Sequence, residues 1–233
     1  MKFSPALHEA RLIRRYKRFL ADVELADGST TTVHCANSGS MMGLAVPGAR
    51  VWLSHHTAKT RKLAYGWELL HLGDAYIGVN TGATNRLVAE ALAKRRIAEL
   101  AGYAMVEREV KTGASRLDFR LGAHESDPRP CYLEVKSVTL RRGGPAEFPD
   151  AVTARGARHL GELAALARAG HRAVMLYVVQ RTDCESFRLA ADIDPAYAAA
   201  FAHAVDAGIE VLCYDCQIDE RGMAVNRPLP IEF

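Results

Sequence analysis

Three residues whose side chains suit phosphodiester chemistry lie close together in the second half of the sequence. Asp118 lies in SRLDFRL, and Glu134 and Lys136 lie two residues apart in CYLEVKSV. Residues two apart in an extended chain share one face, so this carboxylate and this ammonium group point the same way. Two carboxylates on rigid strands are ligands that Mg²⁺ or Mn²⁺ accepts. Such an ion could acidify a water molecule and neutralise the charge of a scissile phosphate.

A hairpin would bring these side chains together. A Pro-rich turn at Ser126–Pro130 separates the two segments, and side chains opposite each other on antiparallel strands lie about 5 Å apart. We expect Asp118 and Glu134 to bind the metal, with the Val135 carbonyl as a third ligand. Lys136 would hold the attacking water or stabilise the pentavalent oxyanion. The alternative is a plain Glu–Lys surface pair on an edge strand, because an E-x-K triplet often occurs by chance.

Four further residues could contribute to the same site. Glu90 could add a carboxylate from a helix above the sheet, or it could pair with Lys94 four residues later. Arg141 and Arg142 lie in the loop Thr139–Asp150, which could close over DNA as a flap or simply be unevenly charged. Gln180 ends a buried strand and could face the cleft.

The sequence after Gly82 predicts a mixed sheet with helices on its faces. Asn85 can cap the first helix, Asp194-Pro195 can open the third, and glycines follow each helix. The order αβββαβ, with αβ appended, favours this architecture. The predicted elements are the helix RLVAEALAKRRIAEL ending at Gly102, the strands YAMVEREV, SRLDFRLG and CYLEVKSV, a helix from Thr153 to before Gly170, the strand RAVMLYVVQ, a helix closed by Gly208 and a last strand IEVLCYDC.

The first eighty residues predict short strands separated by turn signals such as Asp27-Gly28 and Pro47-Gly48. Five strands in this length indicate a small closed barrel, and the OB-fold is the commonest nucleic-acid-binding version. Periodicity alone does not separate an OB-fold from another small barrel. We therefore predict a two-domain α+β protein, with an OB-like barrel over 1–82 and an α/β mixed-sheet domain over 83–233. The predicted barrel strands are LIRRYKRFLADVEL, TTVHCA, ARVWLSHH, KLAYGWELLHL and AYIGVN.

Positive charge is concentrated in the predicted barrel. Up to Gly82 the chain has ten Lys and Arg against six Asp and Glu, although the net charge of the whole chain is only +3. Basic residues mixed with aromatics suit phosphate contact and base stacking, so DNA, or RNA, is the expected partner. A solvated strand face is the alternative. The predicted nucleic-acid-binding residues are Arg11, Arg14, Arg15, Tyr16, Lys17 and Arg18 in one segment, and Arg61 and Lys62, preceded by Lys59, in another.

The composition limits the classes of protein to which the chain can belong. Hydrophobic residues make up 49% and charged residues 24% of the chain, as in ordinary globular proteins. The beginning of the chain lacks the pattern of a signal peptide, and the longest apolar runs are too short to cross a membrane. Five scattered cysteines fit a reducing compartment. These features predict a cytoplasmic protein without a membrane partner, and they leave the oligomeric state open, a homo-oligomer included.

The arrangement D…E-x-K in an αβββαβ order resembles the PD-(D/E)XK nuclease superfamily, whose acid, second acid and lysine match Asp118, Glu134 and Lys136. The chain as a whole resembles the sugar fermentation stimulation protein family, and FPDAVTARG together with EVKSVTL carries this most specifically. The chain departs from the family pattern at Ser38, HHTAKTRKL and Thr84, away from the three site residues. Further stretches that carry the resemblance are LIRRYKRFLADVEL, HCANSGSMMG, PGARVWLS, YGWELL, GVNTGATNRLVAEAL, SRLDFRL and AYAAAFAHAVDAGIEVL.

The resemblance implies an N-terminal OB-like domain, a C-terminal nuclease-like domain, DNA binding and a link to regulation of sugar (maltose) use in bacteria. It leaves two functions open, because nuclease-like domains are also kept as binding modules. One is a DNA-binding protein with a Mg²⁺- or Mn²⁺-dependent phosphodiesterase site. The other is a non-catalytic DNA-binding regulator of sugar metabolism.

Overall fold

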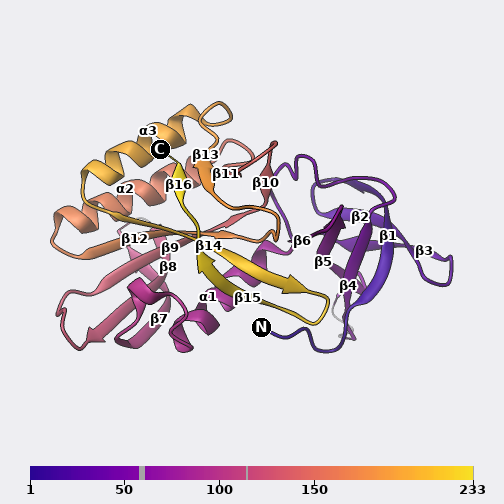
Figure 1. The fold of residues 1–233 in the computed structure, drawn as a ribbon, viewed down its shortest axis with the longest axis horizontal. Coiled ribbons are helices and arrows are strands. Elements are labelled where there is room, and N and C mark those ends of the chain that lie inside the picture. The colour runs from indigo at the N-terminus through magenta and orange to yellow at the C-terminus, as the bar shows by residue number, and fades with distance from the viewer. Residues whose placement is uncertain (58–60, 114, 233) are drawn as a thin grey trace.

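The computed structural model describes residues 1–57, 61–113 and 115–232, so Lys59 lies outside the described residues. A β-barrel formed by the N-terminal part lies beside a larger α/β part (Figure 1). Within the described ranges, no helix is long and apolar enough to cross a membrane.

The barrel has the strand order of an OB-fold. Its sheet runs β3-β2-β1-β4-β5-β6, and pairing of β3 with β5 closes it. Buried apolar side chains such as Leu12, Val33 and Trp67 fill the interior. The barrel confirms the predicted fold class for this part of the chain. The strands are β1 (His8–Tyr16), β2 (Leu20–Leu25), β3 (Thr30–His34), β4 (Arg50–His55), β5 (Tyr65–Leu72) and β6 (Ala75–Gly78).

The prediction of one long basic strand over LIRRYKRFLADVEL is wrong, because the chain turns back within this segment. Strands β1 and β2 pair antiparallel across a turn in which Lys17 and Arg18 adopt the left-handed conformation, with φ of 47° and 63°. Non-glycine residues rarely adopt this conformation, so the sequence carries no turn signal here. The Arg15 guanidinium donates a hydrogen bond of 2.7 Å to the Arg18 carbonyl, which helps to hold the turn.

The second sheet is mixed, as predicted. Its order is β15-β14-β12-β9-β8-β7, with β9, β12 and β14 parallel to one another. Helix α1 (Thr84–Ala93) packs on one face through Leu87 and Val88, and α2 (Ala154–Arg168) and α3 (Pro195–Asp206) cover the other (Figure 1). The strands are β7 (Tyr103–Thr112), β8 (Ser115–His124), β9 (Cys131–Val138), β12 (Arg172–Val179), β14 (Glu210–Asp219) and β15 (Gly222–Pro228).

Several short elements were not predicted. Strand β15 follows the segment expected to be the last strand, and a small four-stranded sheet lies apart from the main one, with two of its strands inside the loop Thr139–Asp150. Strands of two or three residues have no readable period, so only their distant partners define them. The small sheet comprises β10 (Leu140–Arg141), β11 (Ala146–Phe148), β13 (Phe187–Leu189) and β16 (Ile231–Glu232), and the 3-10 turns are η1 (Thr81–Ala83) and η2 (Ala98–Leu100).

The observed ends of α2 and α3 agree with those predicted from the sequence, whereas those of α1 do not. Thr153 accepts a hydrogen bond from the Gly156 N–H, and Asp194 accepts one from the Tyr197 N–H, as capping residues do. Helix α1 begins at Thr84, so Asn85 lies inside the first turn and does not cap it. The helix ends at Ala93, well before Gly102.

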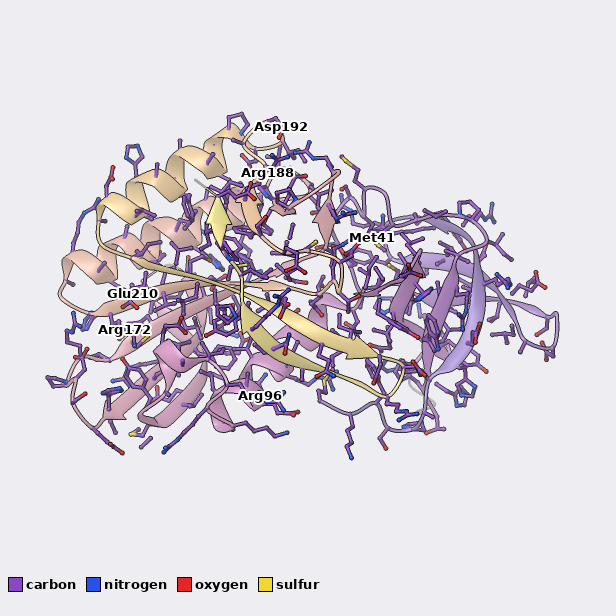
Figure 2. All side chains as sticks on the ribbon, viewed as in Figure 1. Met41, Arg96, Arg172, Arg188, Asp192 and Glu210 are labelled. Atoms are coloured by element: carbon purple, nitrogen blue, oxygen red, sulfur yellow. The ribbon has the colours of Figure 1, made fainter. Side chains whose placement is uncertain are left out.

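The barrel contacts the α/β part through the loop after β3. Ser40 Oγ donates to the Asp150 carbonyl at 2.6 Å, and the Met41 N–H donates to Asp150 Oδ2 at 3.2 Å. Met41, labelled in Figure 2, lies where the two parts meet. A cavity of about 250 Å³ lies at this junction, and its lining includes Gly39 of the barrel and Ser137 at the end of β9.

Candidate metal and phosphate site

Asp118 lies where β8 separates from both of its neighbours. Pairing of β8 with β9 runs from Leu121–Cys131 to Phe119–Leu133, and pairing of β7 with β8 passes from Arg108–Phe119 to Val110–Leu117 without Asp118. The residue opposite, Glu109, has a φ of 55°, which bends β7 at this point. At the next position the Val135 N–H donates to Asp118 Oδ2 at 2.8 Å. A side-chain oxygen thus replaces a backbone acceptor and opens a gap between β8 and β9.

The Asp118 carboxyl is hard to ionise for an aspartate. Its burial and the negative charge of Glu134 raise its pKa to about 6. The hydrogen bonds from the Val135 N–H and from Asn85 Nδ2, the latter at 2.6 Å, lower the pKa but do not cancel this effect. A cation bound here would favour the charged form.

Glu134 points to the opposite face from Val135, toward α2, and is 2% exposed. Its Oε1 accepts a hydrogen bond of 2.6 Å from Lys136 Nζ and another from His159 Nδ1. Burial raises the pKa of this carboxyl, but the hydrogen bond from His159 and the charge of Lys136 outweigh burial and leave it below its usual value. Glu134 is therefore ionised, although it is buried.

The other carboxylate oxygen, Glu134 Oε2, is buried and has no hydrogen-bond partner among the described residues. A buried charged oxygen without a partner is costly, so a native site that contains one calls for an explanation such as a bound ion. Asp118 lies close enough to Glu134 for their charges to interact. This pair of carboxylates, one of them with an open oxygen, fits a divalent cation.

The Val135 carbonyl faces the same gap. In a strand, the N–H and C=O of one residue point toward the same neighbouring strand, and the Val135 N–H points to Asp118. No cluster of three or more His, Cys, Asp or Glu side chains that could hold a metal ion occurs in the described ranges. The ligands available are therefore two carboxylates and a carbonyl, with water in the other positions, which is the donor set that Mg²⁺ accepts. The metal-binding roles of Asp118, Glu134 and Val135 remain predictions.

Two of the further predicted residues belong to other contacts. Glu90 pairs with Lys94 at 2.6 Å and with the N-terminal ammonium group at 2.9 Å, which lowers the pKa of its carboxyl to about 2. The structure therefore supports the helix-pair interpretation of Glu90. Gln180 donates from Nε2 to Thr84 Oγ1 at 2.9 Å and to Ser137 Oγ at 2.5 Å. It braces β9 from the face opposite to Glu134.

The arginines of the loop Thr139–Asp150 are held by hydrogen bonds and ion pairs. Arg141 donates to the Gly144 carbonyl at 3.0 Å. Arg142 forms ion pairs of 2.6 Å with Glu147, which is 1% exposed, and with Asp192. Asp192 is labelled near Arg188 in Figure 2, and Arg188 also pairs with Glu147. This charge network favours a structural role for Arg142, and a flap over DNA remains a prediction.

The basic residues of β1 divide into two groups. Arg15 donates to the carbonyls of Asn37, Gly39 and Ser40, so its guanidinium shapes the barrel. Arg11 donates to a backbone carbonyl, and Arg14 pairs with an aspartate while lying over the Tyr16 ring. Arg11 and Arg14 remain exposed.

The turn after β1 carries the more available charge. Lys17 and Arg18 are exposed there, next to Phe19, which is 43% exposed and whose ring stacks on His34 with 6.4 Å between centroids. His34 also borders a hollow of about 440 Å³. Its other lining residues are His56, Arg61, Lys62 and Leu63.

Phe19, His34 and His159 were not among the residues predicted for either site. Phe19 stands among cations in YKRFL and could have been found if the turn had been recognised. His159 lies on α2, and nothing in its local pattern relates it to a strand residue 25 positions earlier.

The fold and the site residues define a class of protein, in which an OB domain precedes a restriction-endonuclease-like domain. Family models agree: "SfsA N-terminal OB domain" matches residues 13–79, and "Sugar fermentation stimulation protein RE domain" matches residues 82–222. The chain therefore belongs to the sugar fermentation stimulation protein family.

Individual relatives support this membership. The "Sugar fermentation stimulation protein homolog" of Rhodospirillum rubrum is 54% identical, with 99% of each chain covered. That of a Ruegeria species is 56% identical, covering 99% of this chain and 100% of the relative. A solved structure, Pyrococcus furiosus SfsA in complex with Ca²⁺, is 26% identical and matches with a TM-score of 0.90, covering 100% of this chain and 98% of that one.

Proposed function

We propose that the protein binds DNA and that Asp118, Glu134 and Lys136 form a Mg²⁺- or Mn²⁺-dependent phosphodiesterase site. The observation that carries the proposal is the buried Glu134 Oε2, which finds no hydrogen-bond donor in the described part of the chain, on a carboxylate whose charge acts on Asp118. A divalent cation would satisfy this oxygen and would offset the repulsion that raises the Asp118 pKa. The related Pyrococcus protein was solved with Ca²⁺, an ion of the same hard, oxygen-binding kind.

Different residues of the protein would bind the metal and contact the reacting groups. Asp118, Glu134 and the Val135 carbonyl would hold the cation, whose chemistry is to acidify water and neutralise phosphate charge. Lys136, now bound to Glu134, carries an ammonium group that could turn to the attacking water or to the oxyanion of the phosphate. Its side chain is 13% exposed, so substrate could reach it.

The barrel would supply affinity for DNA. Arg14, Lys17 and Arg18 are exposed cations on β1 and its turn, and Phe19 offers an exposed ring for stacking. Arg61 and Lys62 line the adjoining hollow. Cations beside exposed aromatic rings bind phosphates and bases with little regard to sequence. We assign sequence-independent binding to this face.

The test is a cleavage assay with plasmid, single-stranded DNA and RNA in Mn²⁺, using the wild type and the variants Asp118→Ala and Lys136→Ala. We expect the wild type to cut at least one substrate and both variants to lose at least a hundredfold in rate while still binding it, because each removes a group from the reacting centre. Glu90→Gln is the matched control and should cut normally.

Tight binding by the wild type without any cleavage would overturn the phosphodiesterase proposal. That result would favour the second candidate, a non-catalytic DNA-binding regulator of sugar (maltose) metabolism. One observation favours it already: in the residues that the structure describes, no third acidic or histidine side chain completes a metal cluster.

A further inference from the structure

We infer that His159 is a positioning residue that fixes Glu134 for the metal, so that Lys136 is free to act on the substrate. The inference rests on the proposed metal site and deepens it. Glu134 Oε1 receives two donors, Lys136 Nζ and His159 Nδ1. If Lys136 were the sole holder, its movement toward a water molecule or phosphate would release the carboxylate. Because His159 also donates to Glu134 Oε1, Lys136 can move without releasing the carboxylate.

His159 is placed firmly enough for this role. It lies on α2, is 3% exposed, and is followed by Leu160, which is fully buried against the sheet. The Thr153 cap fixes the beginning of the helix. A buried imidazole on a packed helix loses little conformational freedom when it holds a ligand, whereas the long lysine side chain loses much more. Groups that orient a metal ligand from behind typically change metal affinity tenfold or more when they are removed.

The hydrogen-bond pattern shows which ring nitrogen carries the proton. Arg155 Nε donates to His159 Nε2 at 3.4 Å, and a guanidinium group has no acceptor. His159 Nε2 therefore accepts, and the hydrogen lies on Nδ1, where it is donated to Glu134 Oε1. This donor occupies Oε1 and leaves Oε2 as the oxygen for the cation.

The experiment measures Ca²⁺ binding to the full chain by titration calorimetry. The amide nitrogen of asparagine can take the place of Nδ1, whereas that of glutamine falls nearer Nε2. We expect His159→Gln to weaken Ca²⁺ binding by about tenfold or more. His159→Asn should restore binding to within about threefold of the wild type. Lys136→Ala should also bind Ca²⁺ within about threefold of the wild type, while losing cleavage.

Each failure has a distinct meaning. If the wild type binds no Ca²⁺, the metal site itself is refuted. If the wild type binds and His159→Gln binds equally well, the inference about His159 is overturned while the metal site stands. Equal weakening by folded His159→Asn and His159→Gln would also overturn it, because loss of packing would then explain both. His159→Leu removes the donor altogether, whereas His159→Gln moves it away from Glu134, so the test needs only one of these two variants to fold, as checked by thermal melting in EDTA.

Discussion

Replacing Asp118 with asparagine is expected to stabilise the metal-free protein at pH 8 and to have little effect below pH 4. The folded-state pKa of Asp118 is raised from 3.8 to about 6 by burial and by the charge of Glu134. The folded protein therefore binds this proton more tightly than the unfolded chain does. Stability falls as the pH rises through the window from about 4 to about 6, because ionisation costs more in the folded state.

The magnitude follows from the pKa. Each pKa unit corresponds to about 1.4 kcal/mol, so the ionised carboxyl lowers the free energy of unfolding by roughly 3 kcal/mol at pH 8. An amide at this position keeps the local hydrogen bonds. Its oxygen can accept from the Val135 N–H, and its NH₂ can donate to Asn85 once the Asn85 amide turns over. We expect Asp118→Asn to raise the free energy of unfolding by about 1–3 kcal/mol at pH 8. The gain can fall below the full value because the wild-type protein adjusts in part around the ionised carboxyl.

The assay is urea denaturation in EDTA at pH 4, 6 and 8. Asp22→Asn is the matched control with the opposite sign, because Arg14 and Thr32 hold the pKa of Asp22 below its usual value. That variant should lose stability, and lose more at pH 8 than at pH 4. Added Ca²⁺ should stabilise the wild type but not Asp118→Asn. A change in stability for Asp118→Asn that is the same at all three pH values, or negative at pH 8, would refute the reasoning.

Three further predictions concern the barrel. Gly39→Ala should lower the melting temperature by several degrees, because an added Cβ would lie 2.3 Å from an Asp150 carboxylate oxygen at the junction of the two parts. The double variant Lys17→Ala, Arg18→Ala should weaken DNA binding and reduce the salt-dependence slope, measured by fluorescence anisotropy, by about one for each phosphate that the variant no longer neutralises. Arg15→Ala should instead lower thermal stability, since its guanidinium holds four backbone carbonyls.

Much of the α/β part could be predicted because its signals are local. Buried strand β12 is an almost continuous apolar run, β9 places its apolar residues Leu133 and Val135 on one face, and Thr153 and Asp194 are capping residues at the first turn of a helix. The predicted site residues also depend on local pattern, since Glu134 and Lys136 are two apart on one strand. These features need no knowledge of distant contacts.

The parts that could not be predicted depend on contacts between distant residues. The turn of β1 into β2 uses left-handed Lys17 and Arg18, which the sequence does not distinguish from strand residues. Asn85 looks like a helix cap, yet its amide is drawn to Asp118, 33 positions away. His159 contacts Glu134 only because α2 packs over β9. In each case a contact with a residue distant in the sequence outweighed what the local sequence pattern indicates.

The position of Asp118 shows why the site needs more than the right residues in register. Regular pairing of β8 with β9 would set its backbone directly against Glu134 and leave no acceptor position for its side chain. Instead, the bend at Glu109 and the hydrogen bond from the Val135 N–H separate the strands, and the carboxylate enters the gap. This separation leaves the Asp118 carboxylate close enough to Glu134 for their charges to interact, while it accepts a hydrogen bond from the Val135 N–H. The same separation raises the Asp118 pKa, so the cost of the site to the metal-free fold and its proposed affinity for a cation have a single structural cause.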